Sequence, residues 1–278
     1  MKIIRLSNNL KLPFHIFFIV IVCLLTACDM LENNPYDVHI TGEKHLTAKN
    51  ISRIEDITYL QTSIKFAMIS DTQKFYDETV DVVSALNARN DIDFVVHGGD
   101  LTDFGATKEF LWQRDILAKL NVPYVCVIGN HDCLATGVET YESLYGALNF
   151  AFTAGDVRFI CLNTNALEFD YSKPVPDFNF IKDEIRNMPE NVTKSVVLMH
   201  AGPGSDQFDN DKANEFHELI TQLPNLQFCL YGHAHQLASD DLFDDGVIYY
   251  QCPNIQKRTY LVFTINANGT YTYEVEKF

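Results

Sequence analysis

Five apolar segments of this chain are each followed by acidic, amide or imidazole side chains, at the points where strands are expected to end. The residues are Asp71 and Gln73 in ISDTQ, Asp100 in HGGDLTD, Asn130, His131 and Asp132 in GNHD, His200 in LMH, and His233 and His235 in GHAH. Carboxylate and carbonyl oxygens are ligands for hard divalent cations, and imidazoles suit borderline ones. One such residue alone is usually a turn or helix cap, but five successive strand ends are difficult to explain by packing. The set therefore predicts a metal site.

A set of this size suits two metal ions rather than one. Two cations ~3.5–4 Å apart can share a bridging carboxylate, activate a water at neutral pH and neutralise charge on a phosphoryl group. The glycines that adjoin the set allow sharp turns and a close approach of substrate. The chemistry indicated is hydrolysis of a phosphate ester by metal-activated water. Such a reaction needs no covalent intermediate, so Cys133, which follows GNHD, is not expected to take part.

The rest of the chain alternates between strand-like and helix-like patterns. Strands are expected over residues 64–70, 92–97, 122–128, 195–199 and 226–231, with two more in 150–164 and three in 247–277. Helices are expected over residues 74–89, 107–120, 139–148, 177–187 and 210–222. This alternation predicts an α/β domain whose functional groups gather at the carboxyl ends of its strands. The strand-rich tail indicates a second, mixed sheet, and the polar residues 29–60 indicate an irregular lead-in.

The ordered motifs D-x-Q, GGDLTD, GNHD, H and GHAH resemble those of the calcineurin-like metallophosphoesterases, over about residues 64–235. The resemblance implies a four-layer αββα sandwich of two mixed β-sheets flanked by helices, with two metal ions at one edge. It implies that Asp100 bridges the ions. The remaining ligands would be Asp71, Gln73 and His235 for the first ion, and Asn130, His200 and His233 for the second.

The resemblance also implies roles for residues that need not hold metal. His131 would lie beside the leaving group as a general acid. Asp132 would orient His131 by accepting a hydrogen bond from its second ring nitrogen. Asp103 is expected either to support the site from behind the ligands or to cap a turn.

Gln73 departs from the commonest family pattern, which is Asp-x-His. The amide oxygen could coordinate metal and favour manganese or magnesium over zinc. Alternatively, the first metal site is weakened until substrate binds, or the protein is a degenerate binding module. The presence of His131 favours an active site, and an Asp-x-Gln start also resembles a branch with manganese-dependent ADP-ribose/CDP-alcohol diphosphatases and some protein phosphatases. We expect two divalent cations, manganese first, with iron, magnesium or zinc as alternatives.

The first residues have the pattern of an export signal. Lys2, Arg5 and Lys11 precede an apolar run over residues 14–25, which is shorter than the ~20 residues that span a bilayer. The run ends in LTAC, which resembles a bacterial lipobox and implies lipidation of Cys28; the alternative is an uncleaved anchor.

These patterns divide the chain into a signal peptide (1–27), a lipid-anchored tether and lead-in (28–60) and a metallophosphoesterase domain (61–278). The protein is expected to be exported and lipid-anchored to the envelope of a Gram-negative-type bacterium, on the periplasmic or surface side of the outer membrane.

The net charge and the composition of the loops indicate which class of molecule the protein binds. The formal net charge is −16, which repels a phosphate backbone, so no nucleic acid is expected to bind. We expect a small phosphate ester as substrate: a phosphodiester, a nucleotide diphosphate or a phosphomonoester. Tyr76, Phe104 and Tyr171 could stack on a base, and no basic cluster is expected near the motifs. The alternatives are a lipid-anchored protein phosphatase and a non-catalytic binding lipoprotein with a vestigial metal site.

Overall fold

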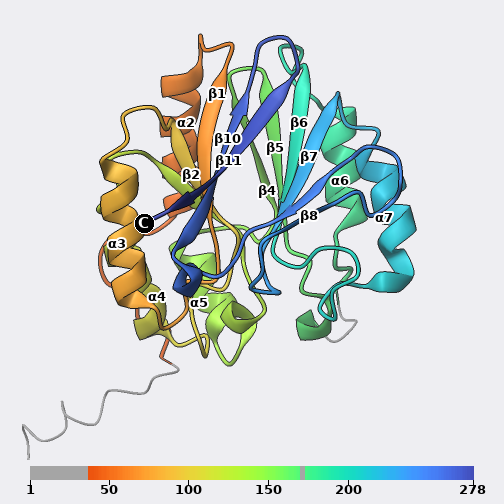
Figure 1. Cartoon of the computed structure of the whole chain (residues 1–278). Helices are drawn as coiled ribbons and strands as arrows, with labels where there is room; N and C mark the ends of the chain where they lie inside the picture. The colour runs from red at the N-terminus through yellow and green to blue at the C-terminus, as the bar shows by residue number, and fades with distance from the viewer. Residues whose placement is uncertain (1–36, 170–172) are drawn as a thin grey trace, which may run out of the picture. The chain divides into compact units, whose positions relative to one another are not determined.

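Two mixed β-sheets pack face to face in the computed structural model, which describes residues 37–169 and 173–278 (Figure 1). The predicted signal peptide, Cys28 and Tyr171 lie outside the described residues. Helices cover the outer face of each sheet, so the predicted αββα sandwich is confirmed. The chain from Val38 to Phe278 forms one compact unit.

The first sheet holds three parallel strands and two antiparallel ones. Its order is β11 (Tyr271–Lys277), β10 (Thr259–Ile265), β1 (Ile64–Ile69), β2 (Phe94–His97) and β3 (Tyr124–Cys126). Strands β1, β2 and β3 are parallel neighbours, whereas β10 runs antiparallel to β1 and β11 antiparallel to β10. The carboxyl ends of β1, β2 and β3 therefore meet at one edge of the sheet, together with the start of β10.

The second sheet has a parallel centre and antiparallel edges. Its order is β4 (Phe150–Ala154), β5 (Val157–Leu162), β6 (Lys194–Met199), β7 (Leu226–Tyr231), β9 (Tyr249–Gln251) and β8 (Ala238–Asp240). Strands β5, β6, β7 and β9 are parallel, and β4 and β8 pair antiparallel to their neighbours. Strand β6 is buried along its whole length, as expected for a central parallel strand covered on both faces.

Aromatic rings join the two sheets in the middle of the sandwich. Phe66 stacks on Phe94 of the same sheet with ring centroids 5.3 Å apart, and meets Phe159 of the other sheet edge-on at 5.1 Å. All three side chains are fully buried. This packing fixes the two sheets against each other, and with them the two sets of strand ends.

Five helices form the outer layers. Helices α3 (Tyr76–Asn87), α4 (Thr107–Leu117) and α5 (Gly137–Leu144) pack on the first sheet, and α6 (Phe178–Arg186) and α7 (Ala213–Ile220) pack on the second. Each covers its sheet with a buried apolar face, for example Val82 and Leu86 of α3 and Phe216 of α7. The helices expected from the sequence are thus present; each is shorter than expected, and α5 begins at Gly137 rather than at residue 139.

The expectation of an irregular lead-in over residues 29–60 is wrong for its second half, where α2 (Leu46–Thr58) forms. Ile54 packs into the core between the sheets and Leu46 into the core under α3 and α4. The polar Thr58 is buried and satisfied, because its hydroxyl donates to the carbonyl of Ile54 and accepts from Gly155 N. Contacts from distant strands therefore stabilise a helix whose own apolar pattern is sparse.

The second mixed sheet expected from the sequence is present, but only one strand of the tail belongs to it. Strand β9 joins the second sheet, whereas β10 and β11 extend the first. The partner of a strand is set by long-range packing, which local pattern does not encode. Within residues 37–169 and 173–278, no helix combines the length and apolar character needed to span a membrane.

Candidate metal centre

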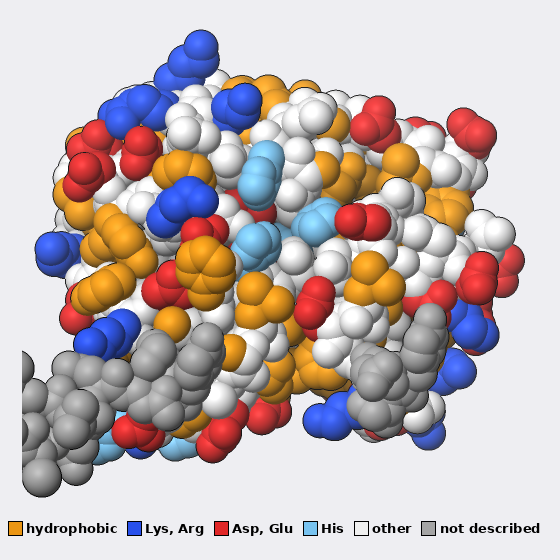
Figure 2. Space-filling model, turned by 90° about the horizontal axis from the view of Figure 1, so that it is seen from below, with side chains coloured by type: hydrophobic (Ala, Val, Ile, Leu, Met, Phe, Trp, Pro, Cys, Tyr) orange, Lys and Arg blue, Asp and Glu red, His pale blue; other side chains and the backbone are white. Residues whose placement is uncertain are grey.

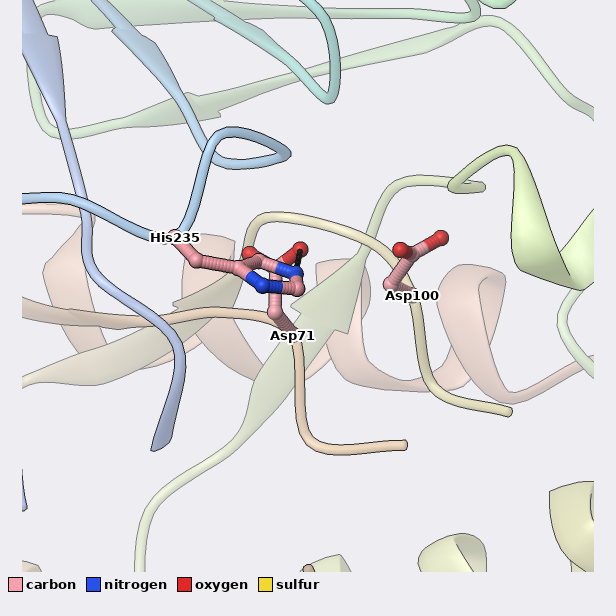
Figure 3. A group of neighbouring side chains, drawn as sticks. All are labelled: Asp71, Asp100 and His235. Atoms are coloured by element: carbon pink, nitrogen blue, oxygen red, sulfur yellow. Dashed lines mark ion pairs between the residues drawn. The ribbon is translucent and has the colours of Figure 1, made fainter. Parts of the chain in front are cut away.

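Three predicted ligands come together where β1, β2 and β7 end. The ligand atoms of Asp71, Asp100 and His235 all lie within 4.8 Å of one another. Figure 3 shows the ring of His235 beside the carboxylate of Asp71, and Nε2 lies 3.2 Å from Oδ1. Asp71 Oδ1 is buried, and no well-aligned N–H or O–H of the described residues reaches it, so its contact with His235 is electrostatic. A buried polar atom normally has a hydrogen-bond partner, and a cation held by these three side chains would take that place.

A second group forms around Asn130. Its Oδ1 lies 3.0 Å from Nε2 of His200 and 3.0 Å from Nδ1 of His233. The other nitrogen of each ring has an acceptor as partner: His200 Nδ1 donates to the carbonyl of Gly98 at 2.7 Å, and His233 Nε2 donates to Asp206 at 2.8 Å. In a neutral imidazole the remaining nitrogen is an acceptor. With the amide oxygen of Asn130 facing both rings, three acceptor atoms converge with no hydrogen among them, which fits a cation.

In the group around Asn130, electrostatics favour the neutral rings that metal binding requires. Burial lowers the pKa of His200. Burial, together with the neighbouring His200, lowers the pKa of His233. Neutral imidazoles keep the lone pairs that face Asn130.

Asp100 lies between the two groups. Its Oδ1 accepts from the backbone N–H of His131 at 2.9 Å and lies 3.5 Å from His200 Nε2, and its Oδ2 lies 3.2 Å from the amide nitrogen of Gln73. Burial and the nearby carboxylates of Asp71 and Asp132 raise its pKa. A bridging position between two cations is the arrangement that would best offset this cost of burying a carboxylate.

Gln73 joins the same cluster. It is buried, and its amide faces Asp100 as described above. Its main chain is fixed on both sides, because its N–H donates to Asp100 O and its carbonyl accepts from Gln113 Nε2. A half turn about the last side-chain bond exchanges the amide nitrogen for Oε1. Gln73 can therefore present an oxygen where the commoner family pattern has an imidazole.

Backbone strain is concentrated at the predicted ligands. Five of the seven lie at positive φ: Asp71 (53°), Gln73 (36°), Asp100 (57°), His233 (66°) and His235 (58°). A residue with a side chain adopts this region at a cost of order 1 kcal/mol or more. Such strain clusters at functional sites, and here it turns the side chains toward one point.

Two of the glycines among the ligands leave room for the carboxylates of Asp71 and Asp100. A Cβ on Gly129 would lie 2.2 Å from Oδ1 of Asp100, and one on Gly232 would lie 2.7 Å from Oδ2 of Asp71. The loops after β3 and β7 thus approach the two carboxylates more closely than a side chain permits.

His131 lies at the start of the 3-10 turn His131–Cys133 and is half-buried. Its Nδ1 donates to the backbone carbonyl of Asp103 at 2.8 Å. Burial alone would lower its pKa, but that carbonyl and the carboxylate of Asp100 outweigh burial and raise it. Nε2 is left available for a bound substrate.

The predicted contact between Asp132 and the ring of His131 is wrong. The carboxylate of Asp132 is fully buried and accepts from the backbone N–H groups of Leu101, Thr102 and Gly129 at 2.8 to 3.1 Å. It ties the loop after β2 to the loop after β3. The partner of His131 is instead the main chain of Asp103, whose carboxylate pairs with Lys74. Residue type and spacing did not distinguish a contact to the ring from contacts to neighbouring main chain.

Residues behind the ligands were missed. His97 is buried, and both of its ring nitrogens have a partner. Nε2 lies 3.0 Å from Thr72 Oγ1, and Nδ1 accepts from the backbone N–H of Gly99 at 3.1 Å. Burial lowers its pKa to about 3, so the ring is neutral. Ser70 donates to Asp71 Oδ2 at 2.5 Å. Ser70 and His97 lie inside the stretches ISDTQ and HGGDLTD, and that position was the signal for them in the sequence.

The sequence of the chain is similar to those of known phosphoesterases. Residues 64–237 match the family model described as calcineurin-like phosphoesterase. The chain is 25% identical over 196 residues to a 3′,5′-cyclic-nucleotide phosphodiesterase of Nostoc sp., across 67% of this chain and 71% of that one. It is 27% identical over 172 residues to a glycerophosphodiester phosphodiesterase of Enterobacter lignolyticus, across 56% of this chain and 61% of that one.

Among solved structures, GAP50, the anchor in the inner membrane complex of Plasmodium, superposes with a TM-score of 0.59 at 12% identity. The superposition covers 77% of this chain and 84% of that one. At this identity, the likeness concerns the fold alone.

Proposed function

The chain belongs to the calcineurin-like phosphoesterase family, and from this premise we propose that it hydrolyses a small phosphodiester with two bound divalent cations. The observation that carries the proposal is the position of Asp100 between two groups of metal-ligating atoms, with the main chain of His131 held against it. A vestigial site would not need both groups and a positioned general acid. The phosphodiesterase names of the two sequence relatives support a diester as substrate.

Two sets of residues would hold the cations. Asp71, Gln73 and His235 would hold the first, Asn130, His200 and His233 the second, and Asp100 both. When bound, the cations would supply an activated water and positive charge opposite the phosphoryl oxygens. The chain's own contribution is to fix these ligands in advance, through the strained backbone and the hydrogen bonds to Gly98 and Asp206.

His131 would act as the general acid. The carbonyl of Asp103 keeps a proton on Nδ1, and the raised pKa of the ring favours a second proton on Nε2. That proton would pass to the leaving oxygen as the phosphorus–oxygen bond breaks. Asp132 would act indirectly, by holding the two loops that carry Asp100 and His131.

We propose manganese as the preferred metal. Oxygen ligands suit harder cations, and with Gln73 in place of an imidazole the first site is richer in oxygen. Asp71, Asp100 and the amide oxygen of Gln73 would give that site three oxygen donors and His235 its single nitrogen.

We also propose that the protein is exported and carries lipid on Cys28. The support is the sequence: basic residues, a short apolar run and LTAC. Labelled palmitate fed to expressing cells should enter the wild-type protein and be absent from Cys28→Ser. Equal labelling of both proteins would contradict the assignment.

Turnover tests the enzymatic proposal. The full chain, purified in detergent, is assayed with manganese on bis(p-nitrophenyl) phosphate and on p-nitrophenyl phosphate. We expect hydrolysis of the diester, abolished by a chelator and reduced by about 10²-fold or more in His131→Ala. His39→Ala, at an exposed position away from the ligands, is the matched control. No turnover above His131→Ala with any divalent metal would instead indicate a binding protein.

A further inference from the structure

A pocket of about 420 Å³ adjoins the metal centre. Its lining includes His235, a proposed metal ligand, together with Leu237, Lys257, Thr259 and Lys277. Its volume lies within the ~300–1,000 Å³ typical of small-molecule sites. The expectation that no basic cluster lies near the motifs is therefore wrong: two lysines share a pocket with a motif histidine.

Strand pairing explains why residues of the tail reach the site. Lys277 pairs with Thr259 across β10 and β11. The start of β10 runs alongside the end of β1, because Leu261 pairs with Met68. Lys277 therefore lies at the sheet edge from which Asp71 projects.

The loop that carries Lys257 is fixed against the GHAH loop. Lys257 ends the 3-10 turn Ile255–Lys257. Just before it, Cys252 N–H donates to Tyr231 O at 2.8 Å, and Gln251 Nε2 donates to Gly232 O at 3.2 Å. Pocket and metal centre are thus positioned by the same loops.

The charge of this pocket is unbalanced. Among the residues that the structure describes, neither Lys257 nor Lys277 has a carboxylate within 4.0 Å, whereas the adjacent Arg258 pairs with Asp81 at 2.8 Å. The described residues that line the pocket include no aspartate or glutamate. Figure 2 shows Lys and Arg side chains beside the histidines on this face. In a protein of net charge −16, two lysines without carboxylate partners form a local site for an anion.

We propose that the Lys257–Lys277 pocket binds a second phosphate group of the substrate, while the ester to be cleaved lies at the metal centre. The preferred substrate would then be a phosphodiester that carries a further phosphate on its retained part. Two ammonium groups offer six N–H donors on flexible stems, which suits a phosphate dianion. Because His235 lines both places, one small molecule can occupy them together. This inference rests on the proposed function.

A pair of substrates that differ by one phosphate tests the proposal. Thymidine 5′-(p-nitrophenyl phosphate) and its 3′-phosphorylated form release the same nitrophenol, so the ratio of their kcat/KM values isolates the second phosphate. We expect the wild-type protein to favour the 3′-phosphorylated form by about tenfold at low salt, and by less at high salt. In Lys257→Gln/Lys277→Gln that ratio should fall to near one.

A second double variant shows whether the loss of preference comes from the pocket lysines or from the change in net charge alone. Lys119→Gln/Lys182→Gln removes two exposed lysines that do not line the pocket and should keep the wild-type ratio. The proposal is overturned if the wild-type ratio is near one, or if both double variants lower it equally.

A binding measurement tests the role of the two lysines independently of hydrolysis. If neither substrate is hydrolysed, the proposed function fails. Calorimetry on the manganese-loaded chain then still shows whether Lys257 and Lys277 bind a phosphate group. Thymidine 3′,5′-bisphosphate should then bind about tenfold more tightly than thymidine 5′-monophosphate, and only in proteins that retain Lys257 and Lys277. Equal affinities would overturn the assignment.

Discussion

Asn130 Oδ1 and His200 Nε2 lie 3.0 Å apart although neither atom carries a hydrogen when Nδ1 of His200 donates to Gly98. Two facing acceptors repel unless a positive charge lies at their meeting point. His233 brings a third acceptor to the same oxygen. This relationship is the strongest local sign that the loops after β3, β6 and β7 are built around a cation.

Removal of Asn130 should therefore empty one metal site. Asn130→Ala is expected to retain the ion at Asp71 and His235, lose the other, and lower diesterase activity by about 10²-fold or more. Bound manganese per chain, measured by mass spectrometry after desalting, checks this. Asn191→Ala, at an exposed position between α6 and β6, should keep the wild-type content. Unchanged metal content in Asn130→Ala would contradict the assignment.

Gln73→His should shift metal preference toward zinc, because it replaces an amide with a borderline imidazole ligand. The expected result is a rise in zinc-supported relative to manganese-supported turnover, by about tenfold. Gln222→His, at an exposed position, is the matched control and should keep the wild-type ratio. An unchanged ratio in Gln73→His would show that this side chain does not reach the metal.

Gly129→Ala should disrupt the centre by crowding. Its Cβ would lie 2.2 Å from the carboxylate oxygen of Asp100, so the loop must move, at a cost of about 2–3 kcal/mol. Gly146→Ala is the comparison, because its Cβ meets nothing within 4 Å and only its φ of 122° is unfavourable. In denaturant unfolding, Gly129→Ala should have a lower free energy of unfolding than Gly146→Ala. It should also lose bound manganese. Equal stability and full metal content would contradict the steric argument.

His97 should make stability depend on pH. Its pKa is about 3 in the folded protein and ordinarily about 6.5. The unfolded chain therefore takes up a proton that the folded chain refuses, and stability present above pH 6.5 is lost as pH falls toward 3. Between pH 7 and 5 the loss from this group is on the order of 2 kcal/mol.

His97→Gln removes the group that titrates and should flatten this dependence. Unfolding curves of metal-free protein at both pH values measure it, with the exposed His39→Gln as the control. An equal loss of stability in wild type and His97→Gln would show that other groups cause the dependence.

The ligand set was predictable because its geometry follows from topology. Parallel strands place their carboxyl ends at one edge, so Asp71 and Asp100 had to lie close together once their strands were recognised. Asn130 and His200 follow β3 and β6, which lie in different sheets, so their pairing was implied by the family resemblance and depends on how the two sheets pack. Glycines beside the ligands supported the prediction.

Other features depend on packing that the local sequence does not specify. Asp132 has the same type and spacing whether it contacts a ring or the main chain, and only the fold shows that it joins two loops. Lys257 and Lys277 are far from the motifs in sequence and reach the site through β10 and β11. Helix α2 forms because both sheets leave an edge that Leu46 and Ile54 fill.

The central claim is that two cations bridged by Asp100 support phosphodiester hydrolysis. Metal-free protein is titrated with manganese while bound metal per chain and bis(p-nitrophenyl) phosphate hydrolysis are followed together. We expect little activity with the first ion and a steep rise as the second binds, and no rise at any manganese concentration in Asp100→Ala. Full activity with one ion bound, or equal activity in Asp100→Ala, would contradict the account.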